Sequence, residues 1–142
     1  TKQHFKLDAI ARINGDSPLL DPALVDKGIS IFTRQQPDLV SNVWPRSYPK
    51  GQSVEIISGR TLELIEKVAI GSDREHITGH IYRNFEEFKI CTFSKKLSSK
   101  DVQLSVDTEK DFKLIENLLK KMKKPHWEYG FEELLKLYKT II

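Results

Sequence analysis

The sequence predicts a single domain of the α/β class, with helices covering a mixed or partly parallel β-sheet. Three observations indicate this class. Strand-like and helix-like segments alternate along the chain, and this alternation is typical of helices packed on a sheet. The 142 residues suffice for one domain with a hydrophobic core. The composition, 39% hydrophobic and 30% charged, is that of an ordinary globular protein.

Five segments are expected to be strands because they are short, rich in apolar residues and bounded by turn-forming residues. They are residues 7–13, 38–43, 53–58, 88–93 and 102–106. Between the second and the third, Pro45, Pro49 and Gly51 predict a loop over residues 44–52. The first segment has the apolar character of a central strand although nothing precedes it. We therefore expect opening strands of the sheet to be missing from this sequence.

Capping residues mark the expected starts of the helices. Asp21 followed by Pro22 is typical of an N-cap with proline at the first helical position, so we expect Asp21 to cap a helix that ends near residue 36 and not to bind a ligand. Capping-box spacings at Ser72 and Thr108 begin two further helices. These two helices are expected to span residues 72–84 and 108–122. Two more helices are expected at residues 61–70 and 132–138.

Charge and cysteine content exclude several classes of function. The net charge is only +3, with 20 acidic residues among 23 basic ones, and this mild excess does not indicate a nucleic-acid partner. No apolar run is long enough to cross a membrane, so no membrane partner is expected. A single cysteine, Cys91, permits neither an internal disulfide nor a cysteine-rich zinc site, which favours the reducing cytoplasm as the compartment.

Two acidic residues directly follow expected strands. Asp16 comes after residues 7–13, in the stretch ARINGDSPLLDP, and Asp107 comes after residues 102–106. In open α/β sheets ligands bind beyond the carboxyl ends of strands, and carboxylates there can hold Mg²⁺. The alternative is structural, because Asn-Gly-Asp-Ser-Pro is rich in turn formers and Asp107 could cap the next helix unless Thr108 does so. Spacing alone favours the turn for Asp16.

Two other segments carry candidate binding residues. Lys50, beside Gly51, could meet a phosphate or carboxylate, or could be a solvated loop lysine. Glu55 lies among apolar strand residues, where a carboxylate needs a partner or a ligand. The segment 73–76, Asp-Arg-Glu-His, concentrates charge in the first turn of an expected helix, where acidic residues are also favoured for structural reasons.

Four motifs in one order resemble a known family. RINGDSPLLDP, YPKGQSVEIIS, DREHITGHIYRN and LSVDTEKDF look like the corresponding motifs of cytidylyltransferases of the spore-coat polysaccharide type, which are related to acylneuraminate and ketodeoxyoctonate cytidylyltransferases. The resemblance runs from about Asp8 to Tyr138, and the final WEYGFEELLKL is similar to the closing helix of that family. Each motif alone is weak, and their order makes the match specific.

The resemblance implies a nucleotide-diphospho-sugar transferase fold, a three-layer α/β/α sandwich with a mixed, mostly parallel sheet. The implied enzyme joins CTP to an acidic or phosphorylated sugar and releases pyrophosphate, giving a CMP- or CDP-activated sugar for surface polysaccharide biosynthesis. The implied cofactor is Mg²⁺, held by Asp16 and Asp107, which are also the expected catalytic residues. Members of the family are often dimers, so a homodimer is also implied.

The resemblance also suggests residues that bind substrate, around the sugar or in a closing loop. They are Asn14, Ser17, Lys50, Gly51, Glu55, Arg74, Glu75 and His76. One feature departs from the family: no nucleotide-binding loop rich in Arg, Ser and Lys precedes Asp8. Residues 1–142 are therefore expected to form the C-terminal portion of one such domain, incomplete as an enzyme by itself. The alternative is a non-catalytic module of the same fold that binds sugar phosphates or a partner.

Overall fold

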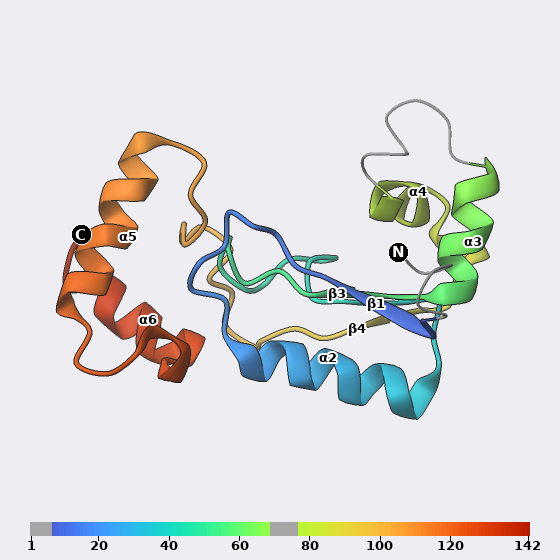
Figure 1. Cartoon of the computed structure of the whole chain (residues 1–142), viewed down its shortest axis with the longest axis horizontal. Helices are drawn as coiled ribbons and strands as arrows, with labels where there is room; N and C mark the ends of the chain where they lie inside the picture. Colours follow the sequence, from blue (N-terminus) through green and yellow to red (C-terminus); the bar gives the residue numbers. More distant parts are fainter. Residues whose placement is uncertain (1–6, 69–76) are drawn as a thin grey trace.

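The computed structural model describes residues 7–68 and 77–142, and these form a four-stranded sheet with α-helices around it (Figure 1). The strands are β1 (Ala9–Arg12), β2 (Leu39–Ser41), β3 (Glu55–Ser58) and β4 (Ile90–Thr92). The α-helices are α2 (Pro22–Gln35), α3 (Gly59–Val68), α4 (Ile77–Arg83), α5 (Glu109–Lys121) and α6 (Phe131–Tyr138), with short 3₁₀ helices η2 (Phe85–Glu87) and η3 (His126–Glu128). The predicted α/β class with a mixed sheet is confirmed.

The strand order is β1-β3-β2-β4, and β3 runs against the other three strands. β3 pairs antiparallel with both β1 and β2, whereas β2 pairs parallel with β4. The expected mostly parallel sheet is thus not found in the described residues, where two of the three pairings are antiparallel. The reason is the loop 42–54, which returns the chain directly from β2 to its neighbour β3 without a crossover helix.

The prediction of a strand at residues 102–106 is wrong. This segment makes one isolated bridge, between Gln103 and Lys50, and does not join the sheet. Its backbone hydrogen bonds are made with loops. The Val102 carbonyl accepts from Lys50 N–H, Leu104 N–H donates to the Lys50 carbonyl, and Val106 N–H donates to the Asp16 carbonyl. Leu104 is buried, and Val102 and Val106 are partly buried, in the cluster with α5 and α6, so the apolar pattern was that of a packed segment and not of a strand.

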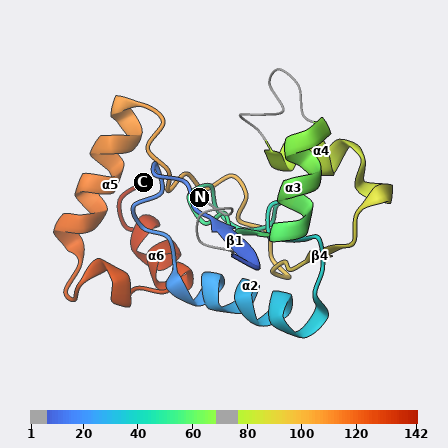
Figure 2. The ribbon, with the colours of Figure 1, turned by 45° about the vertical axis from the view of Figure 1, so that its right-hand side comes forward.

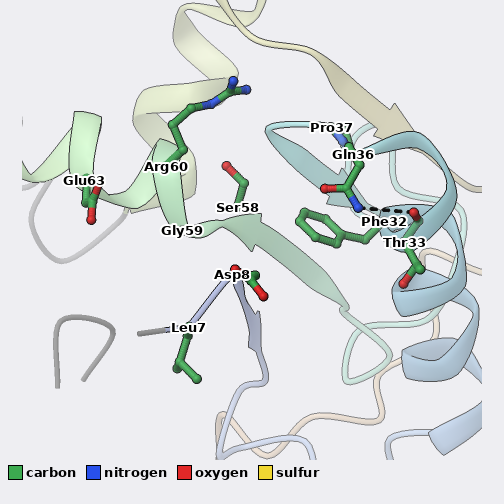
Figure 3. A pocket seen from close by; sticks show the side chains of 10 residues that line it. All are labelled: Leu7, Asp8, Phe32, Thr33, Gln36, Pro37, Ser58, Gly59, Arg60 and Glu63. Atoms are coloured by element: carbon green, nitrogen blue, oxygen red, sulfur yellow. Dashed lines mark hydrogen bonds between the residues drawn. The ribbon is translucent and has the colours of Figure 1, made fainter. Parts of the chain in front are cut away.

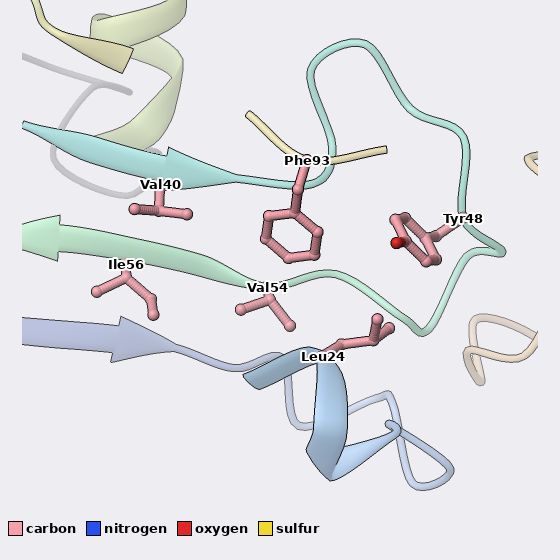
Figure 4. Packing of buried hydrophobic residues seen from close by; sticks show 6 residues of the cluster. All are labelled: Leu24, Val40, Tyr48, Val54, Ile56 and Phe93. Atoms are coloured by element: carbon pink, nitrogen blue, oxygen red, sulfur yellow. The ribbon is translucent and has the colours of Figure 1, made fainter. Parts of the chain in front are cut away.

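Alternation along β3 assigns side chains to the two faces of the sheet. Val54 and Ile56 belong to a cluster that packs against α2, shown in Figure 4, whose buried members are Leu24, Val40, Tyr48, Val54, Ile56 and Phe93. Ile57 belongs to a second cluster with Leu39, Ile65 and Ile81, which packs α3 and α4 against the sheet. Burying each of these aliphatic side chains stabilises the fold by about 1.5–3 kcal/mol.

A third apolar cluster joins α5 and α6 to the loops at one end of the sheet. Its buried members are Leu19, Leu104, Ile115, Leu118 and Leu134. Figures 1 and 2 agree in placing α5 and α6 at the end of the sheet opposite to α3 and α4. This is the end where β1, β2 and β4 finish and where β3 begins. None of the helices in the described part of the chain is both long enough and apolar enough to cross a bilayer.

Asp21 caps α2, as predicted, and also holds α6. One carboxylate oxygen accepts a hydrogen bond from Ala23 N–H at 2.8 Å, while the other accepts one from Phe131 N–H at 2.9 Å. Gln52, which is fully buried, accepts from Asp21 N–H and donates to the Leu19 carbonyl. The carboxylate thus bridges the N-terminal ends of two helices that lie 110 residues apart in the sequence. The capping box predicted at Ser72 falls outside the described residues.

The Asp38 carboxylate links β2 to α3 and to the start of β4. It accepts hydrogen bonds from Arg60 and Thr61 at 2.8 Å and from Lys89 N–H at 2.9 Å. Burial by itself would raise the pKa of Asp38, but the bonds from Lys89 N–H, Arg60 and Thr61 outweigh it and hold the pKa below its ordinary value of 3.8.

We therefore expect Asp38 to stabilise the fold above its ordinary pKa and to lose this effect on acidification. As the pH falls, the unfolded chain takes up the proton first, so stability declines until the pH has passed through the lowered pKa of the folded state. The measurement is the urea midpoint between about pH 7 and about pH 3. Asp38→Asn should have a shallower acid slope than wild type, whereas exposed Asp26→Asn should keep the wild-type slope. Identical slopes for the Asp38 variant and wild type would contradict this role.

Candidate functional site

A cavity of about 220 Å³ is lined in part by the residues just before α5, at the end of the sheet where β1 finishes. Its lining comes from the segment after β1, the loop between β2 and β3, and the segment before α5: Asn14, Asp16, Ser17, Arg46, Lys50, Gly51, Ser53, Ser105 and Asp107. Six of these nine residues are among those expected from the sequence to bind metal or substrate. The structure therefore brings most of the predicted site together.

Backbone hydrogen bonds hold the three segments in place. Val106 N–H donates to the Asp16 carbonyl at 2.8 Å, which sets the segment of Asp107 beside the loop of Asp16. The backbone N–H of Lys50 donates to the Val102 carbonyl at 3.0 Å, and the Lys50 carbonyl accepts from Leu104 N–H at 2.9 Å. The two acidic residues, 91 positions apart in the printed sequence, thus line one cavity because residues 102–106 pair with loops and not with a strand.

Gly51 has a structural role in this arrangement. Its φ of 87° lies in the left-handed region, which side-chain-bearing residues rarely adopt. A Cβ atom at this position would lie 2.5 Å from the backbone carbon of Leu104. Only glycine therefore allows the loop 44–52 to approach the segment before α5 so closely.

Each of the two carboxylates is oriented through one of its oxygens. Asp16 Oδ1 accepts from Ser17 Oγ at 2.8 Å. Asp107 Oδ2 accepts from Gln103 Nε2 at 2.6 Å and is 3.3 Å from Ser105 Oγ. Within the described residues, no hydrogen bond reaches the second oxygen of either carboxylate. Each side chain is thus held while keeping one oxygen for a ligand.

Asp107 does not cap α5. Thr108 takes that position, with its Oγ1 accepting from Asp111 N–H while the Asp111 carboxylate accepts from Thr108 N–H, as the capping-box spacing predicted. The hydrogen bond from the Thr108 hydroxyl lowers the pKa of Asp111. The structural alternative for Asp107, that of a helix cap, is thereby removed.

The donor set suits Mg²⁺ better than zinc. The described ranges 7–68 and 77–142 contain no group of three or more His, Cys, Asp or Glu side chains that could hold a metal ion. Zinc sites require three or four such ligands, whereas Mg²⁺ is commonly held by one or two carboxylates together with water and substrate phosphates. Asp16 and Asp107 would be the ligands.

Two cationic side chains share the cavity with the acids. Lys50 was expected from the sequence, but Arg46 was not. Arg46 donates to Ser53 Oγ at 3.1 Å and lies 3.5 Å from the Pro49 carbonyl. The available signal was its position four residues before Lys50 in the same proline-rich loop. Ser53 and Ser105 were also not anticipated, since a serine in a loop carries no distinctive pattern.

Glu55 does not line this cavity. Its side chain is buried and accepts hydrogen bonds from Arg12 at 2.6 Å, from Thr78 at 3.4 Å and from the Tyr82 hydroxyl. Burial, together with the charge of Glu55, raises the pKa of Tyr82. The partner that a buried carboxylate needs is thus supplied by the protein, so the structure does not bring Glu55 into the site expected from the sequence. The expected residues Arg74, Glu75 and His76 lie outside the described residues.

A larger cavity, of about 620 Å³, lies at the opposite end of the sheet, where β1 begins and β3 ends (Figure 3). Its lining is Leu7, Asp8, Phe32, Thr33, Gln36, Pro37, Ser58, Gly59, Arg60 and Glu63. It contains none of the residues singled out in the sequence. Despite its smaller volume, the cavity that contains both Asp16 and Asp107 is the candidate functional site.

Comparisons with known proteins bear on the fold. No protein-family model matches the sequence. The uncharacterized protein MJ1063 of Methanocaldococcus jannaschii is 35% identical over 116 residues, which cover 80% of this chain and 46% of that protein. A cytidylyltransferase structure from Leptospira borgpetersenii serovar Hardjo-bovis matches with a TM-score of 0.92 and 23% identity, over 98% of this chain and 59% of that one.

The chain thus spans about half the length of the relatives that it matches. The family resemblance expected from the four motifs is supported at the level of architecture. Over 98% of its length, this chain has the fold of the cytidylyltransferase from Leptospira borgpetersenii.

Proposed function

We propose that this chain forms the metal- and sugar-binding part of a cytidylyltransferase of the spore-coat polysaccharide type. The enzyme would join CTP to an acidic or phosphorylated sugar and release pyrophosphate, supplying a CMP- or CDP-activated sugar for surface polysaccharide biosynthesis. One observation carries the proposal: Asp16 and Asp107 line one cavity with Lys50 and Arg46, at the end of the sheet where β1 and β2 finish. The fold shared with a cytidylyltransferase is consistent with it.

The side chains have the chemistry that this reaction needs. A sugar oxygen attacks the α-phosphorus of CTP, a new P–O bond forms, and the bond to pyrophosphate breaks. Mg²⁺ bound by Asp16 and Asp107 would neutralise negative charge on the phosphate oxygens. Lys50 and Arg46 line the same cavity and supply fixed positive charge for an anionic substrate. Ser17 and Gln103 hold the carboxylates in place before substrate arrives.

The proposal covers part of an active site. The matched relatives are about twice as long as the aligned region, and we place the nucleotide-binding loop in sequence beyond these 142 residues. The chain would then correspond to the C-terminal portion of the domain. A homodimer remains a prediction.

The direct test is release of pyrophosphate from CTP by the purified protein, including any sequence encoded upstream of Thr1. Sugar acids, sugar phosphates and neutral sugars are offered in parallel, with and without Mg²⁺. We expect Mg²⁺-dependent release with an anionic sugar, and a CMP- or CDP-sugar of the matching mass. Binding of sugar phosphates without pyrophosphate release under every condition would instead identify the non-catalytic module.

A further inference from the structure

We infer that Arg46, with Lys50 and Ser53, forms the seat for the anionic group of the sugar and so selects charged sugars over neutral ones. This inference rests on the proposed function, because it assigns a recognition role to one wall of the same cavity. The anionic group is a phosphate or a carboxylate, since each can accept two parallel N–H hydrogen bonds from an arginine through a pair of its oxygens.

The first observation is the set of partners of Arg46. Arg46 is half-buried and lines the cavity, yet in the described part of the chain the acceptors of its guanidinium are neutral, Ser53 Oγ and the Pro49 carbonyl. Arg12 and Arg60, by contrast, each pair with a carboxylate. A guanidinium has five N–H donors, so Arg46 retains donors and an unbalanced charge facing the cavity.

The second observation is that Arg46 is held before a ligand binds. Its backbone bridges antiparallel to Val43 within the loop, and the Ser53 hydroxyl fixes one end of the guanidinium at 3.1 Å. A side chain that is already oriented loses less conformational entropy on binding than a free surface arginine. The geometry is therefore that of a prepared binding group and not of a solvated side chain.

The third observation is the balance of charge around the cavity. The formal charges of Asp16, Asp107, Arg46 and Lys50 cancel. A divalent cation on the two carboxylates would leave an excess of two positive charges, which favours a ligand that brings negative charge of its own. A neutral sugar would displace water from Arg46 without supplying a charged partner, which disfavours its binding relative to an anionic sugar.

The test compares glucose with two anionic sugars that each differ from glucose in one group: glucose 1-phosphate at C1 and glucuronate at C6. Binding to the chain is measured by ligand-detected NMR in the presence of Mg²⁺, for wild type, Arg46→Gln and Arg46→Lys. We expect wild type to bind one of the two anionic sugars and not glucose. Arg46→Gln should weaken that binding about 10- to 100-fold, and Arg46→Lys should weaken it less, because lysine keeps the charge but loses the paired donors.

Arg34→Gln is the matched control, because Arg34 is exposed on α2 and, among the described residues, its side chain donates to the Ser30 carbonyl of its own helix. It should bind as wild type does, and circular dichroism confirms that all variants are folded. The preferred anionic sugar shows whether the seat takes phosphate or carboxylate. Equal binding of the anionic sugar by Arg46→Gln and wild type would overturn the inference.

A second readout separates this inference from the proposed function. In the pyrophosphate assay, Arg46→Gln should raise KM for the anionic sugar while leaving KM for CTP close to the wild-type value. A raised KM for CTP alone would assign Arg46 to the triphosphate and overturn the inference while supporting the transferase. Absence of pyrophosphate release, with anion binding still dependent on Arg46, would overturn the transferase but support the seat.

Discussion

Replacing Asp16 or Asp107 with asparagine should lower the rate of pyrophosphate release by about 10²- to 10⁴-fold. Asparagine keeps the size of the side chain and its ability to accept a hydrogen bond, but it removes the negative charge that a hard cation requires. Losing one such ligand costs several kcal/mol of transition-state stabilisation, and about 1.4 kcal/mol corresponds to a factor of ten in rate. The measurement is kcat under saturating CTP and sugar, across a range of Mg²⁺ concentrations.

The Mg²⁺ dependence distinguishes a ligand from a structural residue. Both variants should require more Mg²⁺ for half-maximal rate, while their urea midpoints stay close to that of wild type, because both carboxylates are exposed. Asp101→Asn is the control, since Asp101 is an exposed acid in the same segment that does not line the cavity. If Asp16→Asn retained the full rate, Asp16 would be only the turn residue that its local sequence favours.

Replacing Gly51 with alanine should destabilise the protein by about 3 kcal/mol or more. Two penalties act together: the left-handed backbone conformation is unfavourable for alanine, and the new Cβ atom would lie 2.5 Å from the Leu104 backbone. Because the neighbour is backbone and not a flexible side chain, the loop and the segment 102–106 must move apart. The free energy of unfolding in urea measures the effect.

Gly15→Ala provides a matched control, because Gly15 lies between two residues that line the same cavity, Asn14 and Asp16. No atom lies within 4 Å of a Cβ built at Gly15, and its φ is outside the left-handed region. We expect a change of at most about 0.5 kcal/mol, as for other surface substitutions. The Gly51 variant should also bind anions less well than the Gly15 variant, because Lys50 moves with the loop. Equal stability of the two variants would show that the approach to Leu104 is not required.

The signals that succeeded in the sequence are short-range. Asp21 before Pro22 and Thr108 before Asp111 predicted the starts of α2 and α5, because a capping hydrogen bond joins residues two or three positions apart. The second acceptor function of Asp21, toward Phe131, could not be predicted, because nothing local to either residue indicates the other. The ordered motifs likewise pointed to the fold that the comparison with a cytidylyltransferase bears out.

The sequence by itself thus determined the α/β class, the starts of α2 and α5, and most of the residues that line the candidate site. Tertiary structure decided which residues meet. Residues 102–106 hydrogen-bond to loops, and β3 runs antiparallel to its neighbours. Glu55 pairs with Arg12, and Arg46 lines the cavity. The physical reason is that a hydrophobic pattern records burial but not the partner that causes it. Hydrogen bonds and ion pairs between distant segments are chosen only when the whole chain packs.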